Sequence, residues 1–176
     1  MPEEQITLIE PTEELRKAYV SFLKDFRSAG EPRAAGGGGD VGDDFGAFVR
    51  TLRDNARGVG LAEGQVSAGT YWLVRNDGEI LGTANFRHEL TAHMLHEGGH
   101  IGYSVRPSQR RKGYATRMLA MVLAKCRARG LGRVLVTCDR DNVASARVIQ
   151  KNGGVLENEV VSTETGKIKQ RYWIEL

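Results

Sequence analysis

The chain has no run of eighteen uninterrupted apolar residues, which excludes a membrane-spanning helix by the usual length criterion. Its first twenty residues carry acidic and polar side chains where a secretory signal peptide would be apolar. Cysteine is scarce, and we expect Cys126 and Cys138 to be reduced because two cysteines are too few for a disulfide framework. These absences predict a cytoplasmic protein that does not associate with a membrane.

A large excess of charge of one sign is also missing. The 25 Lys and Arg residues exceed the 22 Asp and Glu residues by a net charge of only +3, so a nucleic-acid partner is not expected. The positive charge is instead concentrated, because five residues between Arg106 and Arg117 are Lys or Arg. This local clustering favours a small anionic ligand.

Length and hydrophobic spacing predict one domain that covers residues 1–176. Strand-like alternation and helical spacing predict, in chain order, a strand at 6–8, helices at 12–26 and 45–55, strands at 71–75, 80–87 and 101–105, a helix at 115–126, a strand at 134–138, a helix at 143–151, and strands at 155–163 and 168–176. Thr12 is expected to cap the first helix, and Asp77-Gly78 to form a hairpin turn. The element order indicates an α/β (α+β) layer with a mixed sheet.

The segment at about 28–44 contains four consecutive glycines and is predicted to be a mobile loop within the domain. Its acidic residues Asp40, Asp43 and Asp44 would suit a lid over a cationic amine. The alternative is an ordinary surface loop.

The twelve residues from Arg106 to Arg117 join the strand at 101–105 to the helix at 115–126, with Gly113 at the junction. A glycine lets the backbone approach an anion closely, and the free N–H groups at a helix N-terminus then face that anion. The sequence therefore predicts a seat for a phosphate-bearing ligand. A basic, solvated turn is the alternative for the side chains of Arg110, Arg111 and Lys112.

The same residues resemble the GNAT superfamily of N-acyltransferases, which bind acetyl-coenzyme A. Arg110-Arg111-Lys112-Gly113-Tyr114-Ala115 fits the signature Arg/Gln-x-x-Gly-x-Gly/Ala, and Asn142 stands where the family often has Asn at the start of a helix. The resemblance implies a mostly antiparallel central sheet of about seven strands flanked by about four helices. It also implies acetyl transfer from acetyl-coenzyme A to a primary amine within a ternary complex, without a metal.

The resemblance also implies which residues hold the coenzyme. The pantetheine would pair with the strand edge at Tyr103, Ser104 and Val105, and the pyrophosphate would lie on Arg110, Arg111, Lys112, Gly113, Tyr114 and Ala115, with Asn142 and Ser145 nearby. Asn142 can equally be a helix N-cap, and Ser145 can lie on the helix surface. Cys138 could lie near the thioester, but a small buried filler is the favoured interpretation.

Proton transfer is less well assigned. Relatives often carry a Glu base near the start of this strand, where the chain has His100, and Glu97 and Glu89 are the next candidates. Many relatives place a Tyr acid in the last helix, where the chain has Ile149, and a Phe where it has Gly154. Either another donor, such as water or Tyr103, protonates the leaving thiolate, or no acid is needed because the thiol is a good leaving group.

The four histidines lie between His88 and His100, but their spacing matches no strong zinc template, and no metal is expected. The acceptor is predicted to be a small-molecule or peptide amine, and the resemblance allows a homodimer. Two other classes stay open: a non-catalytic acyl-coenzyme A binding or sensing module on the same fold, and a phosphate-binding protein of another fold, although the chain lacks the known nucleotide-binding spacings.

Overall fold

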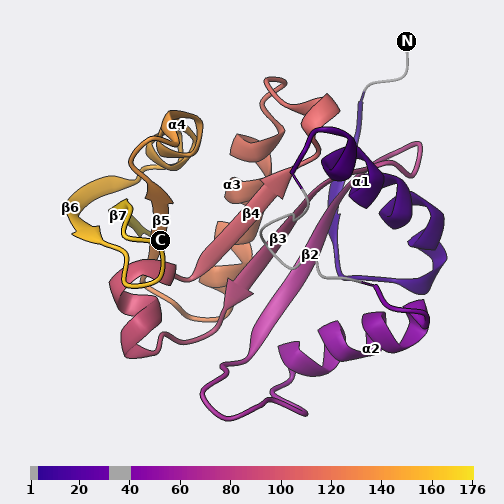
Figure 1. The fold of residues 1–176 in the computed structure, drawn as a ribbon, viewed down its shortest axis with the longest axis horizontal. Coiled ribbons are helices and arrows are strands. Elements are labelled where there is room, and N and C mark those ends of the chain that lie inside the picture. The colour runs from indigo at the N-terminus through magenta and orange to yellow at the C-terminus, as the bar shows by residue number, and fades with distance from the viewer. Residues whose placement is uncertain (1–3, 32–40) are drawn as a thin grey trace.

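The structure is a computed structural model and describes residues 4–31 and 41–176. The main elements follow the predicted order (Figure 1): β1 (Ile6–Ile9), α1 (Arg16–Ser28), α2 (Phe45–Ala56), β2 (Ala68–Arg75), β3 (Ile80–Arg87), β4 (Ile101–Val105), α3 (Tyr114–Ala128), β5 (Arg133–Asp139), α4 (Val143–Lys151), β6 (Val155–Val161) and β7 (Ile168–Glu175). Two 3-10 helices, Glu13–Leu15 and Pro107–Gln109, and a π-helix, Met94–Gly98, join them.

The predicted mixed α+β architecture is confirmed, and its strands are divided between two sheets. The first sheet has the order β1-β2-β3-β4, and the second has the order β5-β7-β6. Every strand pair within them is antiparallel. The division falls between β4 and β5.

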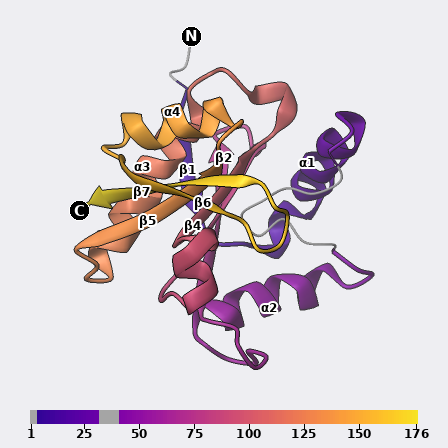
Figure 2. The same cartoon turned by 60° about the vertical axis from the view of Figure 1, so that its left-hand side comes forward.

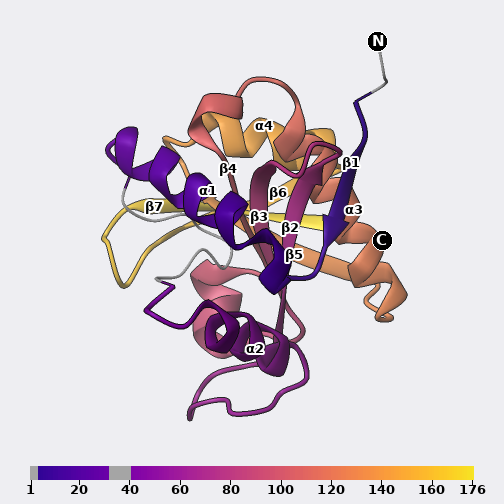
Figure 3. The same cartoon turned by 90° about the vertical axis from the view of Figure 1, so that its right-hand side faces the viewer.

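The helices cover the first sheet on both faces, with α1 and α2 on one side and α3 on the other (Figures 2 and 3). Strand alternation explains this, because successive side chains of β2 point to opposite faces. Trp72 packs with the aromatic residues of α1 and α2, whereas its neighbour Leu73 packs with the apolar face of α3. Each face thus has its own buried core.

The hairpin between β2 and β3 forms as predicted. Gly78 has a φ of 86°, a conformation that glycine adopts without strain. The carboxylate of Asp77 accepts a hydrogen bond from the backbone N–H of Glu79 at 3.0 Å. These local interactions therefore determine the conformation of the turn between β2 and β3.

Three local predictions need correction or fall outside the described residues. Thr12 precedes the 3-10 helix, but its side chain makes no capping hydrogen bond, and α1 begins only at Arg16. The π-helix lies in a stretch for which the sequence indicated no regular structure. Of the predicted loop at 28–44, residues 32–40, including Asp40, lie outside the described residues, whereas Asp44 caps α2 by accepting from the N–H of Ala47 at 2.9 Å.

Cys126 and Cys138 are both free and buried, as expected for reduced thiols. Burial raises the pKa of Cys126 to about 12 and that of Cys138 to about 11. Within the described residues, no helix combines the length and apolar character that crossing a bilayer requires.

Candidate active site at the division between the sheets

The division between the sheets leaves one edge of β4 unpaired. The division is narrow where β4 begins. There the N–H of His100 donates to the carbonyl of Leu135 at 2.7 Å, and the N–H of Leu135 donates to Nδ1 of His100 at 2.9 Å. From Ile101 to Val105, β4 pairs only with β3 within the described part of the chain. The edge of Tyr103, Ser104 and Val105 toward β5 is therefore available for hydrogen bonds to an amide-bearing ligand.

The other end of β4 leads into the predicted anion seat. Arg111 and Gly113 both have left-handed backbone conformations, with φ values of 65° and 82°, and Gly113 is the N-cap of α3. The first turn of α3 carries no acidic residue, so its free N–H groups and dipole are not neutralised there. Apart from Gly113 and its neighbours in the chain, no atom of the described residues lies within 4 Å of the place where a Cβ of Gly113 would stand, which leaves the backbone open to a ligand.

The side chain of Arg110, which was predicted to lie near the pyrophosphate, forms an ion pair with Glu31. Its guanidinium donates to both carboxylate oxygens of Glu31, each at 2.7 Å, and to the carbonyl of Val105 at 3.2 Å. The hydrogen bond with Arg110 lowers the pKa of Glu31, and the same bond raises the pKa of Arg110. Arg110 thus fastens the end of α1 to the loop, and nothing in the sequence pointed to Glu31 as its partner.

The other residues of the signature make separate contacts within the protein. Lys112 donates to the side chain of Gln109 at 2.7 Å, and the side chain of Tyr114 is buried and donates to Glu4. Ala115 packs against the core of α3. Arg111, Lys112 and Gly113 are exposed, and among the described residues the cation of Arg111 makes no hydrogen bond or ion pair.

A pair of hydroxyl groups bridges β4 and α4. The phenol oxygen of Tyr103 lies 2.9 Å from the hydroxyl oxygen of Ser145, and Asn142 caps α4 by accepting from the N–H of Ser145 at 3.1 Å. Burial raises the pKa of Tyr103 to about 12, so this phenol keeps its proton at neutral pH. The capping alternative for Asn142 is thus confirmed, and Ser145 faces Tyr103 instead of lying free on the helix surface.

The departures at Ile149 and Gly154 are linked in the structure. Ile149 is fully buried, and a Cβ on Gly154 would stand only 2.8 Å from the Ile149 carbonyl oxygen. A side chain at position 154 therefore has no room in this backbone arrangement. Glycine at position 154 is thus compatible with the way this turn packs on Ile149, whereas a larger residue is not.

The candidate bases occupy distinct environments. Two hydrogen bonds with Leu135 of β5 hold His100 in place, and we call this link between the two sheets the pin. Burial lowers the pKa of the His100 ring. Because Nδ1 accepts from Leu135, the ring must release that N–H before Nδ1 can take a proton. Glu89 is exposed, while Glu97 is buried and its pKa is lowered to about 2 by hydrogen bonds from Ser162 and Thr163, which makes it a weak base.

The four histidines do not converge on a common centre. His88 contacts Ser67, His93 lies near Glu97 and Glu164, His96 contacts the carbonyl of Val161, and His100 contacts Leu135. Among residues 4–31 and 41–176, no group of three or more potential ligands is placed to hold a metal.

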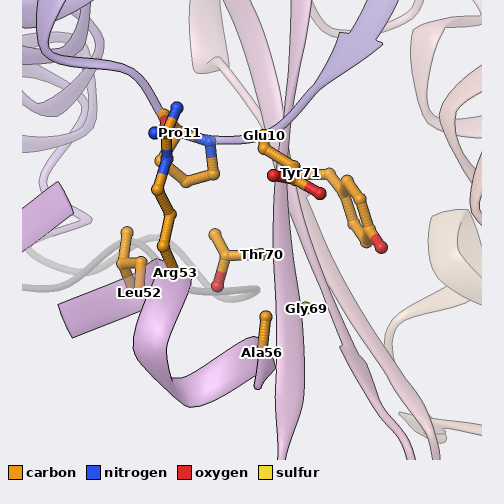
Figure 4. Close-up of a pocket in the computed structure, with 8 residues that line it drawn as sticks. All are labelled: Glu10, Pro11, Leu52, Arg53, Ala56, Gly69, Thr70 and Tyr71. Atoms are coloured by element: carbon orange, nitrogen blue, oxygen red, sulfur yellow. The ribbon is translucent and has the colours of Figure 1, made fainter. Parts of the chain in front are cut away.

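A small pocket lies elsewhere, between α2 and the start of β2 (Figure 4). It is lined by Glu10, Pro11, Leu52, Arg53, Ala56, Gly69, Thr70 and Tyr71. Because β3 separates β2 from β4, this pocket is distinct from the division between the sheets.

Comparison with known proteins identifies the architecture. The family model described as an acetyltransferase (GNAT) domain matches residues 7–155. The chain belongs to the GNAT acetyltransferases. The matched residues include β4, the loop, α3 and α4, so the GNAT signature lies where the unpaired strand edge meets the helix N-terminus.

Solved structures share this GNAT fold at low sequence identity. Mycobacterium smegmatis RimJ in complex with CoA-disulfide is 21% identical, with a TM-score of 0.70, over 97% of this chain and 81% of that protein. A Salmonella typhimurium acetyltransferase that modifies the N-terminal serine of ribosomal protein L7/L12 is 17% identical, with a TM-score of 0.70, over 99% of both chains. The Microcin C7 self-immunity acetyltransferase MccE, solved with acetyl-CoA and AMP, is 17% identical, with a TM-score of 0.68, over 98% of this chain and 93% of that one. No curated protein matches the chain significantly in sequence.

Proposed function

We propose that the protein transfers the acetyl group of acetyl-coenzyme A directly to a primary amine, within a ternary complex of enzyme, donor and acceptor. The observation that carries this proposal is the continuity between the free edge of β4 and the open N-terminus of α3. One surface thus offers strand-like partners for pantetheine amides and backbone N–H groups for a pyrophosphate. We assign the pantetheine to Tyr103, Ser104 and Val105, and the pyrophosphate to the backbone of residues 110–115.

The length of β4 supports a position of the reacting carbon near His100. Four residue steps separate Ile101 from Val105, which is a rise of about 13 Å at strand spacing. A pantetheine arm that starts at the pyrophosphate seat and follows this edge would bring its thioester toward the narrow end of the division. The acceptor amine would then approach from the side of the π-helix and the turn between β6 and β7.

Attack by the amine forms the new C–N bond and expels the thiolate of coenzyme A, and two protons have to be handled. A free amine with a pKa near about 10 is mostly protonated at neutral pH, so it must lose a proton before it attacks. Our proposal is that the leaving thiolate takes a proton from the hydroxyl pair of Ser145 and Tyr103. In this proposal the amine gives its proton to water, and His100 becomes the general base only if its ring first releases the N–H of Leu135.

The environment of Cys138 favours direct transfer over an acyl-enzyme route. Its pKa, raised to about 11 by burial, keeps the thiol protonated and a poor nucleophile at neutral pH. A Cys138→Ala variant should therefore retain turnover. Loss of turnover together with an acetylated Cys138 in the wild type would instead establish a covalent route.

The test of the proposed function combines calorimetry with an amine panel. Acetyl-coenzyme A should bind, and release of free thiol should follow addition of a suitable amine, with mass spectrometry locating the acetyl group on nitrogen. The panel contains peptides with N-terminal serine or alanine, polyamines and aminoacyl nucleotides. Initial rates that intersect when both substrates are varied support a ternary complex, and parallel lines contradict it.

A protein that fails to bind acetyl-coenzyme A would refute the proposal. Binding without turnover on the whole panel would favour the non-catalytic acyl-coenzyme A sensing module. The pair Tyr103→Phe and Ser145→Ala then separates donor binding from proton transfer, because the loss of one hydroxyl proton should lower kcat more than the affinity for the coenzyme.

A further inference from the structure

The π-helix Met94–Gly98 is tied to both sheets. From the second sheet, the hydroxyl of Thr137 donates to the carbonyl of Glu97 at 2.8 Å, and the guanidinium of Arg171 donates to the carbonyl of Leu95 at 3.0 and 3.2 Å. From the first sheet, Arg87 donates to the carbonyls at positions 98 and 99 at 3.2 and 2.9 Å. Figures 1 and 2 show this short helix, between β3 and β4, beside the turn that joins β6 to β7.

The carboxylate of Glu97 makes the connection to that turn. Its side chain is 4% exposed, and it accepts from the hydroxyl of Ser162, from the N–H of Thr163 at 2.9 Å and from the hydroxyl of Thr163 at 2.6 Å. These partners lie 65 and 66 residues away along the chain. The ring of His93 lies 3.7 Å from the carboxylate and also contacts Glu164 at 3.2 Å.

The position of Glu97 relates this contact to the division between the sheets. The chain passes from Glu97 through Gly98 and Gly99 to His100, the pin that closes the narrow end of the division. A shift of the π-helix would therefore move the pin and the turn that flank the space next to it.

We propose that Glu97 is a positioning residue that holds the π-helix against the β6–β7 turn and thereby fixes the wall beside which the acceptor amine binds. The role of this wall in acceptor binding rests on the proposed function. The link between the π-helix and the turn rests on the hydrogen bonds of Glu97 alone. Glu97 acts through Ser162 and Thr163 and does not touch the reacting atoms. Its lowered pKa agrees with a permanently ionised hydrogen-bond acceptor and disagrees with a base that must take up a proton at neutral pH.

The experiment compares Glu97→Ala and Glu97→Gln with the control Glu164→Gln. Glu164 lies in the same turn, 70% of its side chain is exposed, and its replacement removes the same charge without touching the buried contact. Thr163→Val tests the contact from the other side, because it removes one donor and keeps the shape of the side chain. Hydrogen exchange is measured over residues 94–100 and 162–165, together with acetyl-coenzyme A affinity by calorimetry and the KM and kcat for a serine- or alanine-terminated hexapeptide.

We expect faster exchange in both segments for Glu97→Ala, with smaller effects for Glu97→Gln and Thr163→Val, and none for the control. The KM for the hexapeptide should rise by about tenfold or more in Glu97→Ala, as expected when a buried ionised acceptor is lost, while acetyl-coenzyme A affinity changes by less than about twofold. Unchanged exchange in the 162–165 segment of Glu97→Ala would overturn the positioning role. So would a fall in kcat with an unchanged KM, which would instead indicate participation in the chemistry.

The two proposals fail separately. If the wild-type protein does not bind acetyl-coenzyme A, or turns over no amine, the proposed function fails, whereas the exchange measurement still decides whether Glu97 holds the wall. If Glu97→Ala does not fold, Glu97→Gln and Thr163→Val supply the same comparison, and wild-type exchange in both of these would overturn the inference.

Discussion

The two ends of the division between the sheets are built in different ways. The donor end is a continuous stretch from β4 through the loop into α3, and its main features are backbone conformations at Arg111 and Gly113. The acceptor end is assembled from the π-helix, β5, β7 and the β6–β7 turn, whose joining hydrogen bonds span 40 to 76 residues. Local backbone chemistry thus defines the first end, and long-range side-chain contacts define the second.

This difference predicts how each end responds to mutation. A change at the donor end should alter coenzyme affinity and leave the packing between the sheets intact. A change at the acceptor end should disturb the packing itself.

The largest effect is expected for Gly99→Ala at the narrow end. Gly99 has a φ of 67° and a ψ of −179°, and a Cβ there would lie 2.7 Å from the carbonyl oxygen of Leu135. Strain and this backbone clash together should lower the free energy of unfolding by about 3 kcal/mol, measured by urea denaturation.

The matched control is Gly98→Ala, one residue earlier. A Cβ on Gly98 would meet its nearest neighbours at 3.5 Å or more, an ordinary contact distance. Its unfolding free energy should change by less than about 1 kcal/mol. Equal losses for the two variants would mean that the close approach of Gly99 to β5 does not hold the narrow end together.

The second effect is on donor binding. Gly113→Ala introduces a side chain at a φ of 82° and a Cβ into the open space in front of the helix N-terminus. Acetyl-coenzyme A affinity should fall by about tenfold or more, measured by calorimetry, because the backbone can no longer reach the anion freely.

Gly130→Ala separates backbone strain from binding. Gly130 follows the other end of α3 and has a φ of 90°. Apart from its neighbours in the chain, no atom in the described part of the protein lies within 4 Å of the position that its Cβ would take. This variant should lose similar stability and keep its coenzyme affinity. An equal loss of affinity in both variants would contradict a direct role for Gly113.

The donor end could be predicted from the sequence because its signals are local. Alternating residues marked β4, apolar spacing marked α3, and Gly113 between them marked the loop. The partner of Arg110 could not be predicted, because Glu31 comes close only after α1 has packed on the first sheet. Sequence spacing also carries no signal for which strands separate, so the division of the seven strands into two sheets becomes visible only in the structure.

The sequence indicated no regular structure for the stretch that forms the π-helix. The π-helix has no characteristic spacing, and the bonds of Glu97 to Ser162 and Thr163 join segments that the sequence treats independently. Short polar side chains in a turn are usually solvated, so nothing in their order indicates a buried carboxylate between them. Only tertiary packing brings these groups together.

A smaller effect is expected for Arg111→Gly, which tests whether the backbone or the side chain of the loop binds the anion. Arg111 has a φ of 65°, and glycine removes the strain of that conformation, so the free energy of unfolding should rise by about 0.5–1 kcal/mol. If the backbone N–H groups carry the binding, acetyl-coenzyme A affinity should fall by less than about threefold at physiological salt. A loss of tenfold or more, which weakens as salt is raised, would assign the binding to the cation instead.

The smallest effect at neutral pH is expected for His100→Gln, which keeps an acceptor for the N–H of Leu135 and cannot take up a proton. Because Nδ1 is engaged, we expect kcat to stay within about threefold of the wild type, against the hundredfold or greater loss typical of a removed general base. A loss of that larger size with unchanged coenzyme affinity would establish His100 as the base.

The pH dependence of stability supplies a second measurement on the same variant. Burial lowers the pKa of His100 in the folded protein, so the unfolded chain binds the proton more readily. The wild type should therefore lose stability as the pH falls below the ordinary histidine pKa of about 6.5, and His100→Gln should lose less between pH 7 and pH 5. Urea denaturation at both pH values measures the difference, and an equal or larger loss in the variant would show that His100 is not held neutral as the pin between the two sheets.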